Sequence, residues 1–240
     1  MYSLDAGYYY GIGAFETILI KKGKPILIDE HMKRLNSSLL YLHIDKKFTR
    51  ENVLDFLRIK NQMDGILKIT VSEQNIDFST RENPYTPEVY KTGFQLTICS
   101  FLRNETSPLT YHKTLNYAEN ILARQEARKR NYDEALFLNT KGELCEGSCS
   151  NIFFVKGQQL YTPKVSSGLL PGIIRNYICE NENAIERSIT LDDIKYFDEC
   201  FITNSILGIM KISNIEGHYY HSSAFTDTIR NKYKEIQCFN

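Results

Sequence analysis

Lys113 is a residue that could do chemistry, because it stands just ahead of a helical pattern in YHKTLNYAENILARQEARKR (111–130). A lysine is rarely buried unless it has a partner or a function, so one interpretation is a solvated surface cation. The other is a lysine with a lowered pKa, whose amine forms a Schiff base with a carbonyl carbon. The lysine by itself does not decide between the two.

Glu146 is the second candidate, and it lies in GELCEGSCSNIFF (142–154), between glycine turns and an apolar strand pattern. A carboxylate there can be a simple charge on an edge strand. It can also point inward at a cationic ring nitrogen. A pyridoxal cofactor needs such an acid to keep its ring protonated, so that the ring can act as an electron sink.

Two further stretches could bind a phosphate. In GLLPGIIRN (168–176), Pro171 and Gly172 place the backbone N–H groups of Ile173 and Ile174 at a helix N-terminus. Unpaired donors and the helix dipole attract anions to such a terminus, although Pro-Gly helix starts are common. In DEHMKRL (29–35), Arg34 could make a bidentate phosphate contact or be a surface charge.

The segment ITNSILG (202–208) ends an apolar strand pattern with small polar residues. Asn204 and Ser205 could supply more phosphate donors there. The alternative is an ordinary cap between a strand and a turn.

Elements that would position these residues can be predicted along the first hundred residues. Alternating apolar residues predict strands at 14–21, 65–73 and 93–101, and a continuing strand at 25–30 after the turn KKGKP. Helices are expected after Asp29, with Met32, Leu35, Leu39, Leu40 and Leu42 as the apolar stripe, and at 49–60 with Thr49 as N-cap. We therefore expect a small α+β domain at residues 1–104.

Residues 105–240 predict a larger, β-barrel-like domain that carries Lys113. After the helix that follows Lys113, several antiparallel strands are separated by Lys141-Gly142 and Lys156-Gly157. A helix follows Pro171-Gly172, and an amphipathic helix closes the chain. The basic residues Arg124, Arg128, Lys129 and Arg130 are expected to form a solvated helix face.

Composition restricts the partners of the protein. Its 240 residues contain 29 Lys plus Arg and 29 Asp plus Glu, so no net charge attracts nucleic acid or an anionic membrane. No stretch approaches the ~18 apolar residues of a membrane span, and the start is unlike a secretory signal. We expect a cytoplasmic protein with neither a nucleic-acid nor a membrane partner.

The six scattered cysteines favour free thiols over disulfides. Cys145 and Cys149 have no second Cys or His pair nearby to complete a tetrahedral zinc site, so no metal is expected.

Taken together, the motifs resemble those of class IV aminotransferases, the fold-type IV pyridoxal 5′-phosphate enzymes. The matching stretches run in the family's order from Tyr8 to about Ile209: YYYGIGAFETI, DEHMKRL, KTLNYAENILARQEA, EALFLNTKGELCEGSCSNIFF, LYTP, LLPGIIR and ITNSILGI. The resemblance implies a two-domain α+β fold, with a small α/β N-terminal domain and a larger β-rich C-terminal domain with flanking helices. It also implies a homodimer.

The resemblance implies a role for each matching residue. Lys113 matches the lysine that binds the cofactor covalently and moves protons, and Glu146 matches the acid beside the ring nitrogen. Arg34, Ile173, Ile174, Asn204 and Ser205 match phosphate contacts. Tyr117 matches a tyrosine that bonds the ring hydroxyl in branched-chain aminotransferases.

Thr17 favours one branch of the family, the 4-amino-4-deoxychorismate lyases. Branched-chain aminotransferases usually carry Gly at this position, whereas lyases often carry Thr, whose hydroxyl is thought to relay a proton during pyruvate release. Thr17 could also be a β-branched residue suited to a strand. The apolar Ile174, where aminotransferases often have Thr, and the short chain favour the same branch.

Substrate recognition departs from the family pattern. Glu73 stands about where an arginine is expected, and Arg81 and Tyr10 remain as candidates for substrate contacts. We expect a small-molecule amine substrate and a lyase that releases 4-aminobenzoate and pyruvate, a step of folate biosynthesis. The alternatives are an aminotransferase for D-amino or branched-chain amino acids and, more remotely, a cofactor-free interaction protein with the same fold.

Overall fold

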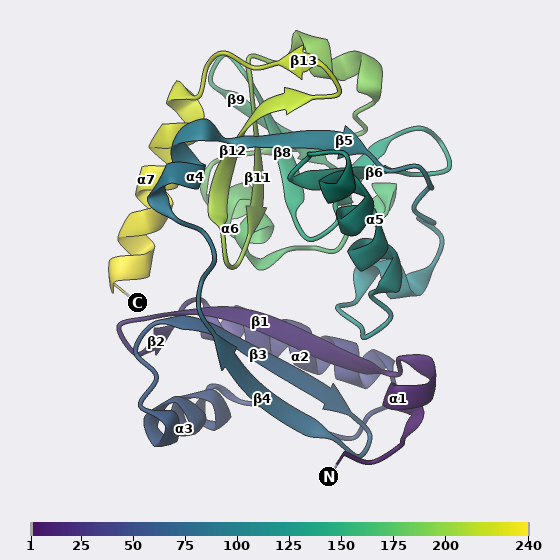
Figure 1. Cartoon of the computed structure of the whole chain (residues 1–240), viewed down its shortest axis with the longest axis vertical. Helices are drawn as coiled ribbons and strands as arrows, with labels where there is room; N and C mark the ends of the chain where they lie inside the picture. Colours follow the sequence, from purple (N-terminus) through teal and green to yellow (C-terminus); the bar gives the residue numbers. More distant parts are fainter. Residues whose placement is uncertain (1, 240) are drawn as a thin grey trace. The chain divides into compact units, whose positions relative to one another are not determined.

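The structure is a computed structural model that describes residues 2–239, with side chains described for residues 2–237. Contacts group the chain into two compact units. The first holds the chain up to Pro84, His112–Tyr117 and the residues from Glu235, and the second holds Tyr85–Tyr111 and Ala118–Lys234 (Figure 1). This division differs from the boundary expected at residues 104 and 105, and it assigns Lys113 to the first unit.

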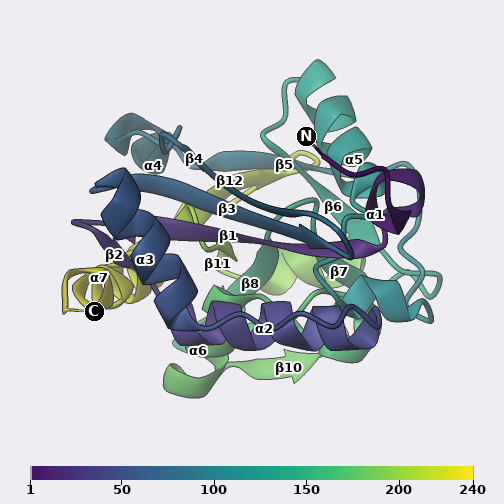
Figure 2. The same ribbon diagram turned by 90° about the horizontal axis from the view of Figure 1, so that it is seen from below.

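The first unit is built on a four-stranded antiparallel sheet in the order β2-β1-β3-β4. Its strands are β1 (Gly13–Lys21), β2 (Lys24–Pro25), β3 (Gly65–Ser72) and β4 (Ile76–Arg81), and its helices are α1 (Ala6–Tyr10), α2 (Ile28–Tyr41) and α3 (Arg50–Lys60). Helix α2 packs against β1 (Figure 2). The core joins Ala14, Ile18 and Ile20 of β1 to Met32, Leu35 and Leu39 of α2.

Helix α3 confirms its predicted bounds and its N-cap. Thr49 is extended ahead of the helix, and its N–H donates to Asn52 Oδ1 at 2.8 Å. This bond is one half of a capping box between Thr49 and Asn52, and it satisfies a donor that would otherwise be left unpaired at the helix start. The chain therefore enters α3 where the sequence indicates.

The first unit differs from the expectation in four places. The strand expected at 25–30 ends at Pro25, because Leu27 adopts a left-handed conformation (φ 52°) and becomes the N-cap of α2 in place of Asp29. Leu40 is 78% exposed, since it lies about 100° around the helix from the buried Leu39. Strand β4 was not expected, and none of its six residues is buried, so it lacks the usual alternation.

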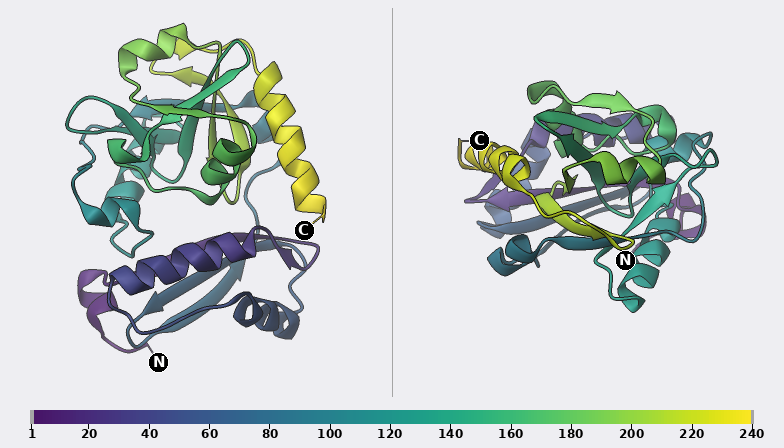
Figure 3. Two further views of the ribbon diagram at one scale, coloured as in Figure 1. Left: turned by 180° about the vertical axis from the view of Figure 1, so that it is seen from behind. Right: turned by 90° about the horizontal axis from the view of Figure 1, so that it is seen from above.

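The second unit contains a nine-stranded sheet that curls into a half-barrel (Figure 3). Eight strands follow the order β10-β9-β8-β11-β12-β5-β6-β7, and β13 pairs with β12. The strands are β5 (Phe94–Ile98), β6 (Glu134–Leu138), β7 (Leu144–Gly147), β8 (Asn151–Lys156), β9 (Gln159–Pro163), β10 (Ile185–Arg187), β11 (Glu199–Asn204), β12 (Gly208–Ile215) and β13 (His218–Tyr219).

Helices flank this sheet. They are α4 (Pro87–Thr92), α5 (Ala118–Lys129), α6 (Ile173–Asn181) and α7 (Ala224–Phe239), with 3-10 turns η1 (Pro108–Tyr111), η2 (Val165–Ser167) and η3 (Leu191–Tyr196). The helix predicted after Pro171-Gly172 is confirmed, with Gly172 as its N-cap. Among the described helices, none has the length and apolarity that a bilayer crossing requires.

Strand β5 explains why the units divide before residue 104. It pairs in parallel with both β12 and β6, which places residues 94–98 inside the second sheet. Parallel neighbours far apart in sequence leave no local signal, so β5 could not be assigned to its sheet from the sequence. The antiparallel pairs β6–β7 and β8–β9 confirm the prediction for residues 134–163.

The basic face expected on α5 is partly wrong. Arg128, Lys129 and Arg130 are exposed, but Arg124 is half-buried. Its Nη2 donates to the hydroxyl of Tyr85 at 3.4 Å. The Arg124 side chain therefore contacts Tyr85 within the second unit and is not a fully solvated charge.

Candidate active site

Lys113 is positioned by backbone bonds to the start of β1. The N–H of Phe15 donates to the carbonyl of Lys113 at 3.0 Å, and the N–H of Leu115 donates to the carbonyl of Gly13 at 2.8 Å. A Cβ at Gly13 would stand 2.6 Å from Leu115 Cδ1. The segment can therefore lie this close to β1 because residue 13 has no side chain.

The Lys113 side chain is half-buried between two aromatic rings. Its Nζ lies 4.4 Å from the ring centroid of Phe15 and 5.0 Å from that of Tyr117. The two rings meet edge to face, with centroids 5.1 Å apart. A cation over aromatic faces is stabilised electrostatically, so the rings hold the lysine head in place. Two of the predicted site residues, Lys113 and Tyr117, thus lie side by side within the first unit.

Thr17 shares the face of β1 that carries Phe15. Side chains two residues apart in a strand point to the same face. The register places Thr17 opposite Lys68, whose Nζ lies 5.1 Å from the Phe15 ring centroid. Thr17 therefore belongs to the same surface of the sheet as the ring that Lys113 contacts.

Arg34 lies on the other side of β1, in an ion pair with the fully buried Glu16. Its Nε donates to Glu16 Oε1 at 2.7 Å and its Nη2 donates to Glu16 Oε2 at 2.8 Å. His31, one helical turn earlier in α2, places Nδ1 2.6 Å from Glu16 Oε2. Two donors of the guanidinium are thereby oriented by a carboxylate that water does not reach.

The protonation states of this cluster follow from its burial and charges. Burial by itself would raise the pKa of Glu16, but the Arg34 guanidinium and His31 outweigh it and hold that pKa below its usual range. Burial lowers the pKa of His31. At neutral pH, Glu16 is therefore ionised and His31 is neutral, with a proton on Nδ1 facing the carboxylate.

The sequence interpretation missed Glu16 and His31, which form one buried cluster with Arg34, a predicted site residue. A signal for Glu16 was present, because a carboxylate inside the apolar strand AFETILIK needs a buried partner. Its partner could not be named, since the register between β1 and α2 depends on tertiary packing.

Glu146 lies one residue before the end of β7 in the second unit and is 7% exposed. Its Oε2 accepts a bond from the N–H of Leu170 at 3.0 Å and lies 3.5 Å from Asn151 Nδ2. Its Oε1 lies 3.6 Å from Nη2 of Arg103, a buried arginine that the sequence interpretation did not select. The predicted acid therefore lies on a strand at the edge of the sheet, but it is a buried carboxylate with a cation beside it rather than a solvated charge.

Asn151 ties Glu146 to the start of α6. Its Nδ2 also donates to the carbonyl of Leu170 at 2.9 Å, and a Cβ at Gly172 would stand 2.0 Å from its Oδ1. The N-cap residue, Gly172, has no side chain that could cap the helix, and the first turn contains no acidic residue. The N–H groups of Ile173 and Ile174 therefore lie at a helix terminus that its glycine N-cap does not cap, and one asparagine joins this terminus to the Glu146 carboxylate.

The segment Asn204–Ser205, at the end of β11, contacts the turn that follows Glu146. Asn204 Nδ2 donates to the carbonyl of Cys149 at 3.0 Å, and its Oδ1 accepts bonds from the N–H groups of Ile206 and Leu207, both at 2.9 Å. Asn204 thus shapes the loop, which was the alternative interpretation of this segment. The second unit brings Glu146, the α6 start and this loop together around residues 146–151.

Arg81 and Tyr10 are both exposed in the first unit. Arg81 ends the edge strand β4, opposite Ile66, and Tyr10 ends α1 with 72% of its surface accessible. Their roles in substrate recognition stay predictions.

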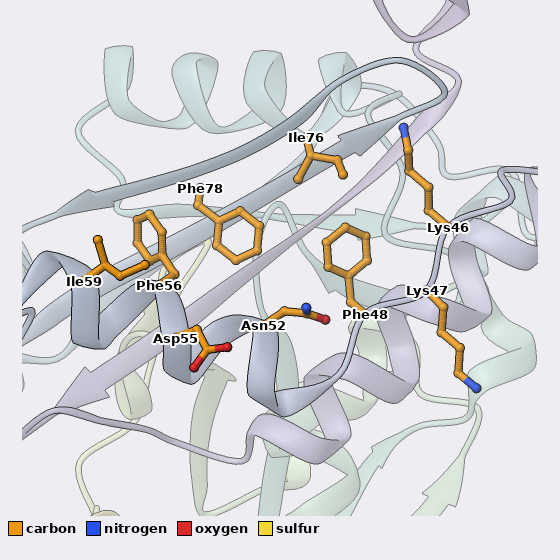
Figure 4. A pocket seen from close by; sticks show the side chains of 9 residues that line it. All are labelled: Lys46, Lys47, Phe48, Asn52, Asp55, Phe56, Ile59, Ile76 and Phe78. Atoms are coloured by element: carbon orange, nitrogen blue, oxygen red, sulfur yellow. The ribbon is translucent and has the colours of Figure 1, made fainter.

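A groove on the first unit contains none of the predicted residues. It lies along α3 and β4 and is lined mainly by apolar side chains (Figure 4). Its lining consists of Lys46, Lys47, Phe48, Asn52, Asp55, Phe56, Ile59, Ile76 and Phe78. Phe56 and Phe78 pack with ring centroids 5.1 Å apart, so this surface is an extension of the core.

Comparison with known proteins identifies the family. The family model for amino-transferase class IV matches residues 13–215. The chain belongs to the class IV aminotransferase family. Members of this family are pyridoxal-phosphate enzymes, which confirms the expected fold class, enzyme class and cofactor.

Similar class IV proteins carry different activities in their names. The aminodeoxychorismate lyase of Bacillus subtilis (strain 168) is 28% identical over 92% of this chain and 83% of that protein. The D-alanine aminotransferase of Bacillus licheniformis is 28% identical over 92% of this chain and 84% of that protein. The crystal structure of 4-amino-4-deoxychorismate lyase from Pseudomonas aeruginosa superimposes with a TM-score of 0.87 at 24% identity, covering 98% and 95% of the two chains, which shows a shared fold.

The residues present fit the family's cofactor. Lys113 supplies an amine, Glu146 a buried carboxylate for a ring nitrogen, and the α6 start supplies backbone donors for a phosphate. Thr203, next to the Asn204–Ser205 loop, is 1% exposed, and its hydroxyl has no hydrogen-bond partner among the described residues. A buried hydroxyl of this kind is expected to have an acceptor, which a phosphate oxygen would provide.

Proposed function

We propose that this class IV enzyme is an aminodeoxychorismate lyase, which converts 4-amino-4-deoxychorismate to 4-aminobenzoate and pyruvate for folate biosynthesis. The observation that carries the proposal is Thr17, which shares a strand face with Phe15, the ring that Lys113 contacts. Similarity to the B. subtilis lyase over 92% of the chain supports it.

Lys113 would bind the cofactor covalently, give way to the substrate amine and then take the proton from the amine-bearing carbon. Glu146 would keep a proton on the ring nitrogen. When bound, pyridoxal phosphate supplies a ring that accepts the electron pair left by that proton. The Phe15 and Tyr117 rings would orient the Lys113 amine for this transfer.

Thr17 would relay a proton through its hydroxyl from the protonated Lys113 amine to the departing enolpyruvyl group. The electron pair would return to the substrate ring as its C–O bond breaks, so that pyruvate leaves and the ring becomes aromatic as 4-aminobenzoate. Isoleucine or valine at position 17 would keep the strand but supply no proton. The hydroxyl therefore separates a lyase from an enzyme that merely removes the first proton.

Phosphate binding would use backbone N–H groups and polar side chains. The N–H groups of Ile173 and Ile174, together with Ser205, would donate to the phosphate oxygens. Arg34 would contribute a guanidinium already oriented by Glu16. Asn204 would act through the loop it shapes, and the Tyr117 hydroxyl would bond the ring hydroxyl.

A class IV aminotransferase is the second candidate, and the similarity to D-alanine aminotransferase favours it. The residues that hold the cofactor would be the same. The two reactions differ in what leaves: a transaminase returns the proton to the cofactor and releases a keto acid. Arg81 and Tyr10 would then be candidates for substrate contacts in either reaction.

One assay separates these two functions. The protein is supplied with chorismate, glutamine and the synthase components that make aminodeoxychorismate, and 4-aminobenzoate is measured. In parallel, D-alanine, leucine or glutamate is offered with 2-oxoglutarate or pyruvate. The lyase proposal expects 4-aminobenzoate in the first reaction, and rapid keto-acid formation without any 4-aminobenzoate would reject it.

A colour test distinguishes the proposed enzyme from a protein that has the same fold but binds no cofactor. The purified protein should be yellow, and borohydride should bleach it by reducing the bond to Lys113. A Lys113→Ala variant should lose both properties, with Lys68→Ala as a control for a cation on the same strand face. A colourless protein that takes up no added cofactor would contradict the proposal.

A homodimer in the cytoplasm completes the proposed function. Tyr8 and Tyr9, 71% and 59% exposed, support an interface on α1. Five cysteines among those described are free thiols, which suits a reducing compartment, while Cys238 lies outside the side chains that the structure describes. Sedimentation of Tyr8→Ser/Tyr9→Ser against the unchanged protein tests the interface, and an unaltered dimer would reject this location for it.

A further inference from the structure

Arg103 is a buried cation in the second unit, and it lies beside the acid that is proposed to hold the cofactor's ring nitrogen. It is 7% exposed, and its Nη2 lies 3.6 Å from Glu146 Oε1. Within the described residues, its Nε and Nη2 have no hydrogen-bond acceptor. A buried guanidinium with unused donors is costly, so its position beside a carboxylate needs an explanation.

The rest of the Arg103 side chain is held firmly. Its guanidinium lies 3.9 Å from the ring centroid of Phe137. Its Nη1 is 3.3 Å from Glu119 Oε2 and 3.5 Å from Asn120 Oδ1. Asn120 Nδ2 in turn donates to the carbonyl of Ser148 at 2.7 Å, in the turn that follows Glu146. Arg103 is therefore fixed against both the acid and its turn.

We propose that Arg103 is a positioning residue for Glu146, whose charge partly neutralises the carboxylate and so limits how strongly it holds the proton of the cofactor's ring nitrogen. The inference rests on the proposed cofactor role of Glu146. In the protein without cofactor, Arg103 is a counter-ion for Glu146. When cofactor is bound, the protonated ring supplies a second cation to the same carboxylate.

Other ionisable groups near this pair do not change their protonation state around neutral pH. Burial raises the pKa of the Cys145 thiol well above its usual range, so it stays neutral. The Ser188 hydroxyl and other bonds lower the pKa of Glu143 to about 2, and the Thr140 hydroxyl lowers that of Glu105. Both carboxylates stay ionised, which leaves Arg103 as the cation nearest to Glu146 among the contacts described.

The charge argument makes a prediction that a packing role does not. If Arg103 only fills space against Phe137, its loss lowers the melting temperature equally with and without cofactor. If it is the counter-ion of Glu146, its loss harms the cofactor-free protein more, because removing one partner of a buried ion pair leaves an uncompensated charge. Bound cofactor then restores a cation.

The experiment measures melting temperature for the full chain with and without pyridoxal phosphate. Arg103→Met and Arg103→Gln remove the charge, Arg103→Lys keeps it, and Glu119→Gln removes the 66%-exposed surface partner of Arg103 as a matched control. Both neutral variants should gain at least about 3 °C more on loading than the unchanged protein, a shift of the order expected for a change of about tenfold in an equilibrium constant at this chain length.

Arg103→Lys and Glu119→Gln should gain as much as the unchanged protein. A neutral variant that folds only when loaded also supports the proposal. Equal losses with and without cofactor, an enlarged gain in the Glu119→Gln control, or neutral variants that fail to fold even when loaded would overturn it. An unchanged protein that gains nothing on loading instead rejects the proposed cofactor binding itself.

Discussion

Replacing Glu16 by glutamine removes the carboxylate charge on which Arg34 and His31 converge, at nearly constant volume. Glu16 has no exposed surface, and the Arg34 side chain is 15% exposed. The variant leaves a mostly buried guanidinium without its counter-ion. It also turns the short bond from His31 Nδ1 into a contact with a neutral amide.

The expected loss of unfolding free energy is about 3 kcal/mol. Breaking a buried ion pair by removing one partner costs about 3–5 kcal/mol. The low end applies because Arg34 keeps some contact with water and the glutamine oxygen can still accept one of its bonds. In an Arg34→Met background, Glu16→Gln should cost about 1–2 kcal/mol less, since the stranded cation is gone.

Urea unfolding of the cofactor-free protein, followed by circular dichroism, measures these losses. Glu30→Gln removes an exposed carboxylate from α2 and should stay within about 0.5 kcal/mol of the unchanged protein. The reasoning is refuted if Glu16→Gln costs less than about 1 kcal/mol, or if its cost is the same with methionine at position 34.

The same variant has a defined pH dependence. Burial opposes ionisation of Glu16, but Arg34 and His31 outweigh it and keep its pKa below that of an unfolded glutamate. A lowered carboxyl pKa contributes stability above the unfolded pKa and loses it as pH falls toward the folded value. The difference between the unchanged protein and Glu16→Gln should therefore be full at pH 7 and shrink below about pH 4. A difference that stays constant down to pH 3 would contradict this assignment.

Three further variants test two residues of the candidate site and Asp5, the N-cap of α1. Gly172→Ala would bring a Cβ within 2.0 Å of Asn151 Oδ1, so it should cost about 1–3 kcal/mol in urea unfolding and weaken cofactor binding; unchanged affinity would argue against phosphate at the α6 start. Asp5→Asn removes a carboxylate whose pKa is lowered to about 2 by the Ser72 hydroxyl and backbone N–H groups. The unchanged protein should therefore melt at a higher temperature than the variant above about pH 4, and this difference should fade toward pH 2. A difference that grows in acid would contradict the lowered pKa. Thr17→Val should leave the protein yellow and lower 4-aminobenzoate formation by about 10²-fold, whereas full activity would remove Thr17 from the proton path.

Local patterns predicted the elements whose signals lie within a few residues. Helix α3 begins after Thr49, as its capping pattern indicates, and α6 begins after Gly172. The predicted start of α2 was wrong, because no sequence signal indicates that Leu27 adopts a left-handed conformation. Strand β4 was not predicted, because an edge strand without buried residues lacks the alternation of apolar and polar residues on which the prediction depends.

By itself, the sequence determined the family motifs and the chemically able residues, Lys113 and Glu146, because a motif is a matter of residue type and spacing. It could not pair charges across elements. The tertiary structure alone decided that Glu16 is the counter-ion of Arg34 and that Arg103 is buried beside Glu146. The physical reason is that the cost of a buried charge depends on which distant side chain reaches it, and that is settled when helices and strands pack.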